Sequence, residues 1–186
     1  EASYWTIAVG SKRAENAVWS YEDPFPEAAH IKDYVAFYWD RVDAWFEEDE
    51  EIFVHACDPH VRIDVLASGR PVKVVLGGEM VAESDRAMFV FETGMPTRYY
   101  MPAEDVRMDL LEPSGTQTSC PYKGTADYWS ARLGDETFED AVWSYPAPLP
   151  EVAGIKGLLC FFNERVDAIT VDGAEVPKTR TKWSVD

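Results

Sequence analysis

The sequence repeats itself at a constant spacing. Residues 1–46 align with residues 125–170 at an offset of 124 positions without a gap, and 21 of the 46 aligned positions are identical. Ala17–Tyr21 returns as Ala141–Tyr145, and Arg41–Ala44 returns as Arg165–Ala168. Chance does not produce this agreement, so we infer a tandem duplication of one structural unit.

The two copies differ in what precedes the repeated part. The later copy has roughly fifty further residues ahead of it, beginning near the strand-like Val72–Leu76. We therefore expect residues 1–57 to be the C-terminal half of a first repeat, residues 58–71 a connector and residues 72–186 a complete second repeat. Because half a domain leaves strand edges and apolar faces uncovered, a missing upstream segment or another chain is expected to complete the first repeat.

Composition excludes several classes of protein. With 46% hydrophobic residues the chain can bury a core, and it is therefore not disordered. Its net charge of −17 opposes binding to nucleic acid or to anionic lipid, and no run is long enough to cross a membrane. Three cysteines make no disulfide framework, which favours the cytoplasm.

Short apolar runs separated by Gly, Pro, Ser and Asp predict a mainly β domain with one helix per repeat. The strongest signal is a hairpin of 72–76 and 80–82 around Gly77-Gly78, and the acidic run 47–51 is expected at a turn between two strands. The other expected strands are 87–91, 98–101, 106–111, 128–133 and 141–145. A helix is predicted from Pro150, because the apolar residues from Ile155 to Val166 recur at helical spacing, and its counterpart begins at Pro26.

Several motifs of the second copy, in fixed order, resemble the bacterial family called domain of unknown function 427. They are Phe91-Glu92-Thr93-Gly94-Met95-Pro96-x-Arg98-Tyr99-Tyr100-x-Pro102, Cys120-Pro121-Tyr122-Lys123-Gly124, Tyr128-Trp129-Ser130 and Val142-Trp143-Ser144-Tyr145-Pro146. The resemblance implies a β-tent, two small antiparallel sheets leaning together, as in the thalidomide-binding domain of cereblon, yippee proteins and methionine sulfoxide reductase B. Those relatives usually hold zinc through paired Cys-x-x-Cys motifs, which this sequence lacks, so we expect packing to hold the fold together.

The candidate site combines aromatic with charged residues. Flat apolar walls with a cation and a carboxylate suit a small-molecule pocket, although aromatic residues on alternating strands are more commonly simple core. The charged members of the set would need partners if they were buried. The candidates are Glu92, Arg98, Tyr100, Cys120, Tyr122, Lys123, Trp129 and Trp143.

The sequence also suggests a role for each group. The two tryptophans and Tyr122 would form the walls of the pocket. Arg98 and Lys123 would anchor an anionic or carbonyl group of an unknown small molecule, and Glu92 would act as an acceptor or would orient Arg98.

Two other classes of function stay open. An enzyme could use Cys120 as a nucleophile activated by Lys123, or Glu92 as an acid or base, although a buried inert thiol is the favoured interpretation of Cys120. A structural or protein-interaction module could use the tandem arrangement itself. No metal or cofactor is expected, because the spacing of His55, Cys57 and His60 fits no common zinc pattern. Cys160 is expected in the core.

Overall fold

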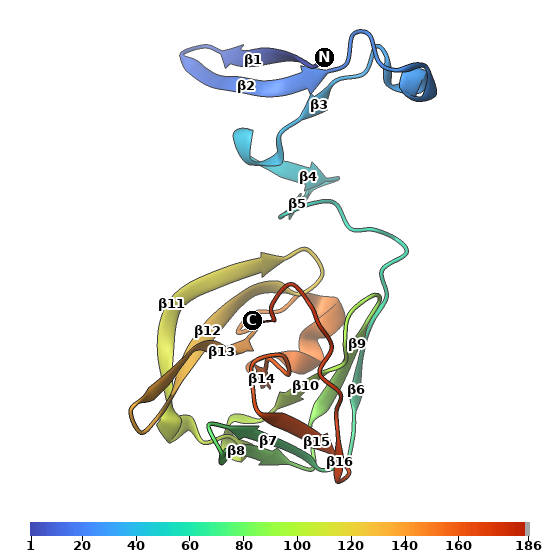
Figure 1. Ribbon diagram of the computed structural model, residues 1–186. Helices are drawn as coiled ribbons and strands as arrows, with labels where there is room; N and C mark the ends of the chain where they lie inside the picture. The colour runs from blue at the N-terminus through green and yellow to red at the C-terminus, as the bar shows by residue number, and fades with distance from the viewer. Residues whose placement is uncertain (185–186) are drawn as a thin grey trace. The chain divides into compact units, whose positions relative to one another are not determined.

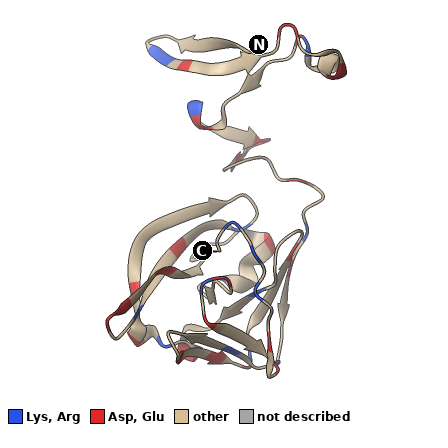
Figure 2. Ribbon diagram, viewed as in Figure 1, with Lys and Arg blue, Asp and Glu red and all other residues tan. Residues whose placement is uncertain are grey.

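The computed structural model describes residues 1–184 and shows two compact units, Glu1–Ala56 and a second that begins at Cys57. Both are built from short antiparallel strands, and in the described residues every helical segment is a short 3-10 turn (Figure 1). The fold is therefore mainly β, as the sequence predicts. The chain has 34 acidic and 17 basic residues, and both kinds are distributed along the ribbon (Figure 2).

The second unit contains two antiparallel sheets. The larger sheet has the strand order β11 (Leu111–Cys120), β12 (Gly124–Leu133), β13 (Glu136–Ser144), β14 (Leu159–Phe161), β10 (Arg98–Met101), β9 (Met88–Glu92) and β6 (Ile63–Ala67). The smaller sheet has the order β16 (Ala174–Glu175), β15 (Ala168–Val171), β7 (Val72–Leu76) and β8 (Glu79–Ser84). β7 and β8 form the predicted hairpin around Gly77-Gly78.

Two hydrophobic clusters pack against the larger sheet. The inter-sheet core joins it to the smaller sheet through residues such as Val74, Phe89 and Phe161. The second cluster, here called the aromatic core, includes the 3-10 turn η5 (Pro150–Ile155). Neighbouring residues of β10, β13 and β14 belong to different clusters, since successive strand side chains point to opposite faces. The aromatic core consists of Val90, Tyr100, Ala126, Trp143, Tyr145, Val152, Ile155, Cys160 and Phe162.

The helix predicted from Pro150 to Val166 is wrong. Helical structure ends with η5, Gly157 takes a positive φ of 70°, and β14 follows. The apolar residues matched helical spacing because β14 is buried on both faces, and a strand of that kind is apolar at every position. In the first unit the predicted helix from Pro26 is likewise a 3-10 turn, η1 (Pro26–Ile31), followed by the strand β3 (Ala36–Phe37).

One other expectation differs from the structure, and the expected connector has structure of its own. The 3-10 turn η4 (Met108–Leu110), which follows the turn η3 (Ala103–Asp105), occupies most of the predicted strand 106–111, and β11 begins only at Leu111. The expected connector 58–71 contains β6, which pairs along its whole length with β9. Its residues Ile63 and Val65 pack against the aromatic core, so the segment has a structural role.

The first unit has a three-stranded antiparallel sheet with the order β1 (Ser3–Val9), β2 (Lys12–Ser20), β3. After the turn η2 (Trp39–Arg41), a hairpin of β4 (Trp45–Glu47) and β5 (Glu50–Ile52) places the acidic run at a turn, as predicted.

The pairing registers of the two units correspond at the sequence offset. Tyr4 lies opposite Trp19 in the first unit, and Tyr128 lies opposite Trp143 in the second. Both hairpins also have a register shift at the same place, after Trp5 and after Trp129.

Candidate functional site

Arg98 makes a buried, bidentate ion pair with Glu164. Its Nη1 and Nη2 atoms each donate to a different carboxylate oxygen at 2.7 Å, and the two side chains are only 8% and 1% exposed. Burial is the largest single influence and opposes charge on both groups, but hydrogen bonds and Coulombic attraction together exceed it, so the pKa of Glu164 is lowered and that of Arg98 is raised. Both groups are therefore charged at neutral pH.

Aromatic rings surround this pair. The Arg98 guanidinium carbon lies 5.6 Å from the ring centre of Trp143, 5.7 Å from Phe162 and 5.5 Å from Trp183. Attraction between a cation and the faces of aromatic rings supplements the ion pair in these apolar surroundings. Trp143 also donates its indole N–H to the Tyr100 hydroxyl at 3.0 Å, and the two rings meet edge to face. Burial raises the pKa of Tyr100 well above its ordinary value, so this hydroxyl stays neutral.

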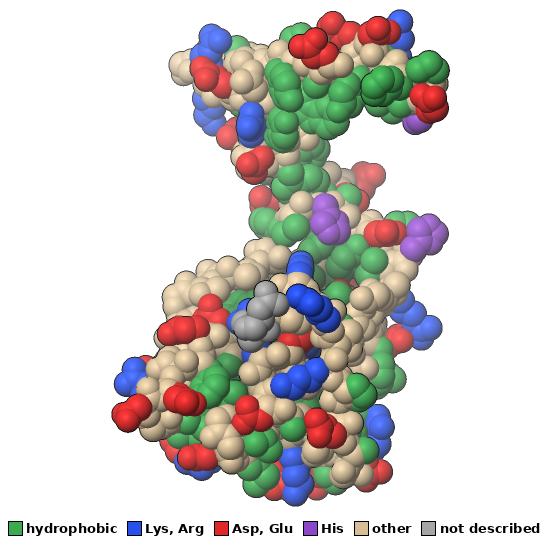
Figure 3. All heavy atoms as spheres, viewed as in Figure 1, with side chains coloured by type: hydrophobic (Ala, Val, Ile, Leu, Met, Phe, Trp, Pro, Cys, Tyr) green, Lys and Arg blue, Asp and Glu red, His purple; other side chains and the backbone are tan. Residues whose placement is uncertain are grey.

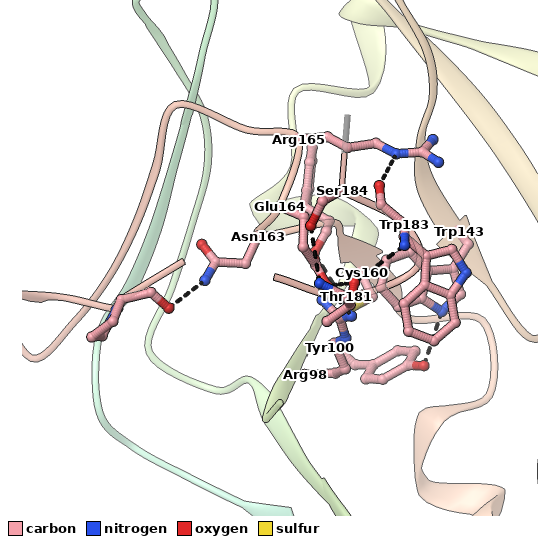
Figure 4. A network of polar contacts seen from close by, with 12 residues as sticks. Arg98, Tyr100, Trp143, Cys160, Asn163, Glu164, Arg165, Thr181, Trp183 and Ser184 are labelled. Atoms are coloured by element: carbon pink, nitrogen blue, oxygen red, sulfur yellow. Dashed lines mark hydrogen bonds and ion pairs between the residues drawn. The ribbon is translucent and has the colours of Figure 1, made fainter. Parts of the chain in front are cut away.

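The C-terminal segment contacts the same ion pair, as Figure 4 shows. Thr181 donates its hydroxyl to Glu164 Oε1 at 2.6 Å and accepts from the backbone N–H of Trp183. Arg165 Nε donates to the Trp183 carbonyl at 3.1 Å. These contacts place the Trp183 ring near Arg98 without any strand pairing of this segment.

Lys123 and Glu92 form a second ion pair. Lys123 Nζ donates to Glu92 Oε2 at 2.6 Å, and the side chains are 10% and 16% exposed. Glu92 ends β9, and Lys123 lies in the turn between β11 and β12. Gly124, with a φ of 96°, makes this turn possible; a Cβ there would lie 3.2 Å from the Ala147 carbonyl oxygen.

The expected pairing of Glu92 with Arg98 is therefore wrong. Arg98 lies opposite Val90, two positions before Glu92 in β9, but its guanidinium binds Glu164 and Glu92 binds Lys123. Sequence reasoning missed Glu164 because it assigned that region to a helix. The sequence did contain a signal for Glu164. It lies two residues after the apolar run 158–162, and the position 124 residues earlier also holds an acid, Asp40.

The structure brings six of the eight expected residues around the aromatic core and packs Trp129 against the other cluster. Trp129 packs against the inter-sheet core, because it alternates with its neighbour Tyr128, which packs against the aromatic core. The hydroxyl of Tyr122 accepts from the backbone N–H of Asp58 at 2.8 Å. The six that gather are Glu92, Arg98, Tyr100, Cys120, Lys123 and Trp143.

The cysteines differ in accessibility, and all three are free thiols. Cys120 is half-buried against the aromatic core, beside the Lys123 turn. Cys160 is fully buried as expected, and burial raises the pKa of its thiol to about 12. Cys57 is exposed and donates to the Pro121 carbonyl at 3.4 Å.

Within residues 1–184, no group of three His, Cys, Asp or Glu side chains is arranged to hold a metal ion. In the same part of the chain, no helix is long and apolar enough to cross a membrane.

The chain belongs to the family described as domain of unknown function DUF427, whose profile matches residues 1–48 and 64–172. The second match begins within β6, and the first ends in the turn between β4 and β5. No curated protein matches the chain significantly.

Proposed function

We propose that the second unit binds a small molecule against its aromatic core, oriented by the Lys123–Glu92 pair. The observation that carries the proposal is the presence of two ion pairs, both largely buried, on one aromatic cluster. Packed hydrophobic residues usually stabilise a fold as well as a buried ion pair does, so stability alone does not account for both. Charges held in apolar surroundings are typical of binding and catalytic sites.

The two pairs have different roles in this proposal. Both Nη atoms of Arg98 already donate to Glu164, so Arg98 fixes the walls formed by Trp143 and Phe162 rather than anchoring a ligand. Among residues 1–184, Lys123 forms its ion pair through one contact, from Nζ to Glu92 Oε2, whereas Arg98 uses two nitrogens on Glu164. A carboxylate or carbonyl of the ligand takes a hydrogen bond from Lys123, while the aromatic rings cover its apolar part.

A thermal-shift screen of small carboxylates and carbonyl compounds tests this proposal, using the whole chain and Lys123→Gln. The matched control is Lys156→Gln, which removes an exposed lysine of the same unit. A compound that raises the melting temperature of the wild type and the control, but not of Lys123→Gln, supports the proposal. Equal responses from all three proteins refute it.

An enzyme that uses Cys120 or Glu92 in the same site is the alternative. Its difficulty is that the Lys123 ammonium, which would stabilise a Cys120 thiolate, already binds Glu92. Native mass spectrometry after treatment with iodoacetamide separates the two: rapid labelling of Cys120 favours the nucleophile.

We also propose that the chain is a tandem duplication of a β-tent. Corresponding side-chain contacts support the duplication. Arg41 Nη1 donates to the carbonyls of Glu15 and Asn16, and Arg165 Nη1 donates to those of Glu139 and Asp140 at the same offset. The two antiparallel sheets that share the inter-sheet core support the β-tent. Free cysteines agree with the proposed cytoplasmic location.

A further inference from the structure

The first unit exposes residues whose counterparts in the second unit form the core. Val35 and Phe37 are 56% and 45% exposed, whereas Leu159 and Phe161, which occupy the equivalent positions, are each 2% exposed. Figure 3 shows hydrophobic side chains gathered along one face of the first unit. The same local structure is therefore covered in one unit and uncovered in the other.

In the second unit a neighbouring strand, β10, covers the residues equivalent to Val35 and Phe37. β14 pairs with β13 on one edge and with β10 on the other, with Tyr100 opposite Cys160 and Met101 opposite Leu159. In the first unit β3 pairs with β2 on one edge, and no strand of the described residues pairs with its other edge. Ala36 of β3 occupies the position of Cys160, so the uncovered edge is the one that β10 occupies in the second unit.

The charges and the indole at this edge also lack their counterparts. Asp40 occupies the position of Glu164, but it is exposed and makes no ion pair among the described residues. Trp19 occupies the position of Trp143, and among residues 1–184 its indole N–H makes no hydrogen bond like the one from Trp143 to Tyr100. A strand like β10 supplies both groups, an arginine for the acid and a hydroxyl for the indole.

We propose that the outer edge of β3 binds an antiparallel strand with the chemistry of β10, an arginine followed two positions later by a tyrosine, from a half-repeat equivalent to residues 64–124. Backbone hydrogen bonds along the edge fix the strand, and the side chains that alternate along it decide which strand fits. A second folded copy of this chain does not fit, because its own β10 already pairs with β9 and β14. This inference rests on the register comparison and is independent of the small-molecule proposal.

The test is an extended protein with a second copy of residues 64–124 joined directly before Glu1. This junction reproduces the step from Gly124 to Thr125 within the second repeat. Hydrogen exchange is measured by NMR at the amides of β3 in the wild-type chain and in the extended protein. We expect exchange at Ala36 or Phe37 to slow by about tenfold or more, since an edge amide gains a strand partner. Exchange at Cys160 serves as the internal reference and stays unchanged.

A charge exchange makes the test specific. The substitution Arg98→Glu, made only in the added copy, is expected to abolish the slowing of hydrogen exchange at β3. The further substitution Asp40→Lys in the first unit is expected to restore part of that slowing. Equal exchange at β3 in the wild type, the extended protein and both variants overturns the proposal. Concentration-dependent dimerisation of the wild type, removed by Phe37→Asp in sedimentation velocity, also overturns it, because a second copy would then cover the face.

Discussion

Removing the carboxylate beside Arg98 is expected to destabilise the second unit strongly. Glu164→Gln keeps the size of the side chain but leaves the guanidinium charge buried without a counter-ion. Breaking a buried ion pair by removing one partner costs about 3–5 kcal/mol. The Glu164 side chain is 1% exposed, so water does not replace the lost contact. The upper part of that range is therefore the appropriate expectation.

The matched control is Glu112→Gln, which removes an exposed partner of Arg132. Exposed ion pairs contribute about 0–1 kcal/mol, so this variant should resemble the wild type. A double variant, Arg98→Met with Glu164→Met, should recover much of the stability lost in Glu164→Gln, because it removes the buried charge together with its partner.

Native-state hydrogen exchange at amides of β14 and of the buried end of β13 (141–144) provides the assay, because buried strand amides exchange through large openings of the second unit. A loss of 3–5 kcal/mol corresponds to exchange faster by about 100- to 5,000-fold. If Glu164→Gln changes exchange no more than Glu112→Gln does, the ion pair is effectively solvated and the reasoning fails.

Three further outcomes follow from the same structure. The pKa of Glu164 is lower in the folded state than in the unfolded state, so the stability that its charge contributes is complete above the unfolded pKa of about 4.3 and is lost as pH falls through the folded pKa. Urea titrations should therefore show the free energies of unfolding of the wild type and Glu164→Gln converging in acid. A difference between them that stays constant with pH would contradict this. Iodoacetamide should label Cys57 in the native protein and Cys160 only after denaturation, as peptide mass spectrometry can verify. Gly124→Ala should lower the free energy of unfolding in urea by about 1–3 kcal/mol, because Gly124 has a positive φ. Gly115→Ala, with open space around the residue, should leave it nearly unchanged. Similar losses for the two variants would refute the role of the Gly124 turn.

Much of the fold could be predicted from local sequence signals. The hairpin at Gly77-Gly78 and the turn in the acidic run were correct because glycine and repelling charges act within a few residues. The helix from Pro150 was wrong because periodicity cannot separate a helix from a strand that is buried on both faces. The first turn after Pro150 was nonetheless placed correctly as helical, in its 3-10 form.

The sequence predicted charged residues within the aromatic motifs but did not predict which residues they contact. The charged residues within aromatic motifs are buried and paired, as their surroundings required. Their partners could not be predicted, because Arg98 and Glu164 are 66 residues apart and meet only through the pairing of β10 with β14. The C-terminal contacts of Thr181 and Trp183 depend on the same long-range geometry.

The sequence by itself determined that two segments 124 residues apart share 21 of 46 residues, that the chain is mainly β and that its aromatic motifs contain charges needing partners. Only the tertiary structure decided that Glu164 forms an ion pair with Arg98, that Lys123 forms one with Glu92, and that Trp129 and Trp143 pack in different hydrophobic clusters. The physical reason is the separation along the sequence of the residues that interact. Turns and strand patterns follow from neighbouring residues, whereas ion pairs and core membership follow from which strands lie side by side.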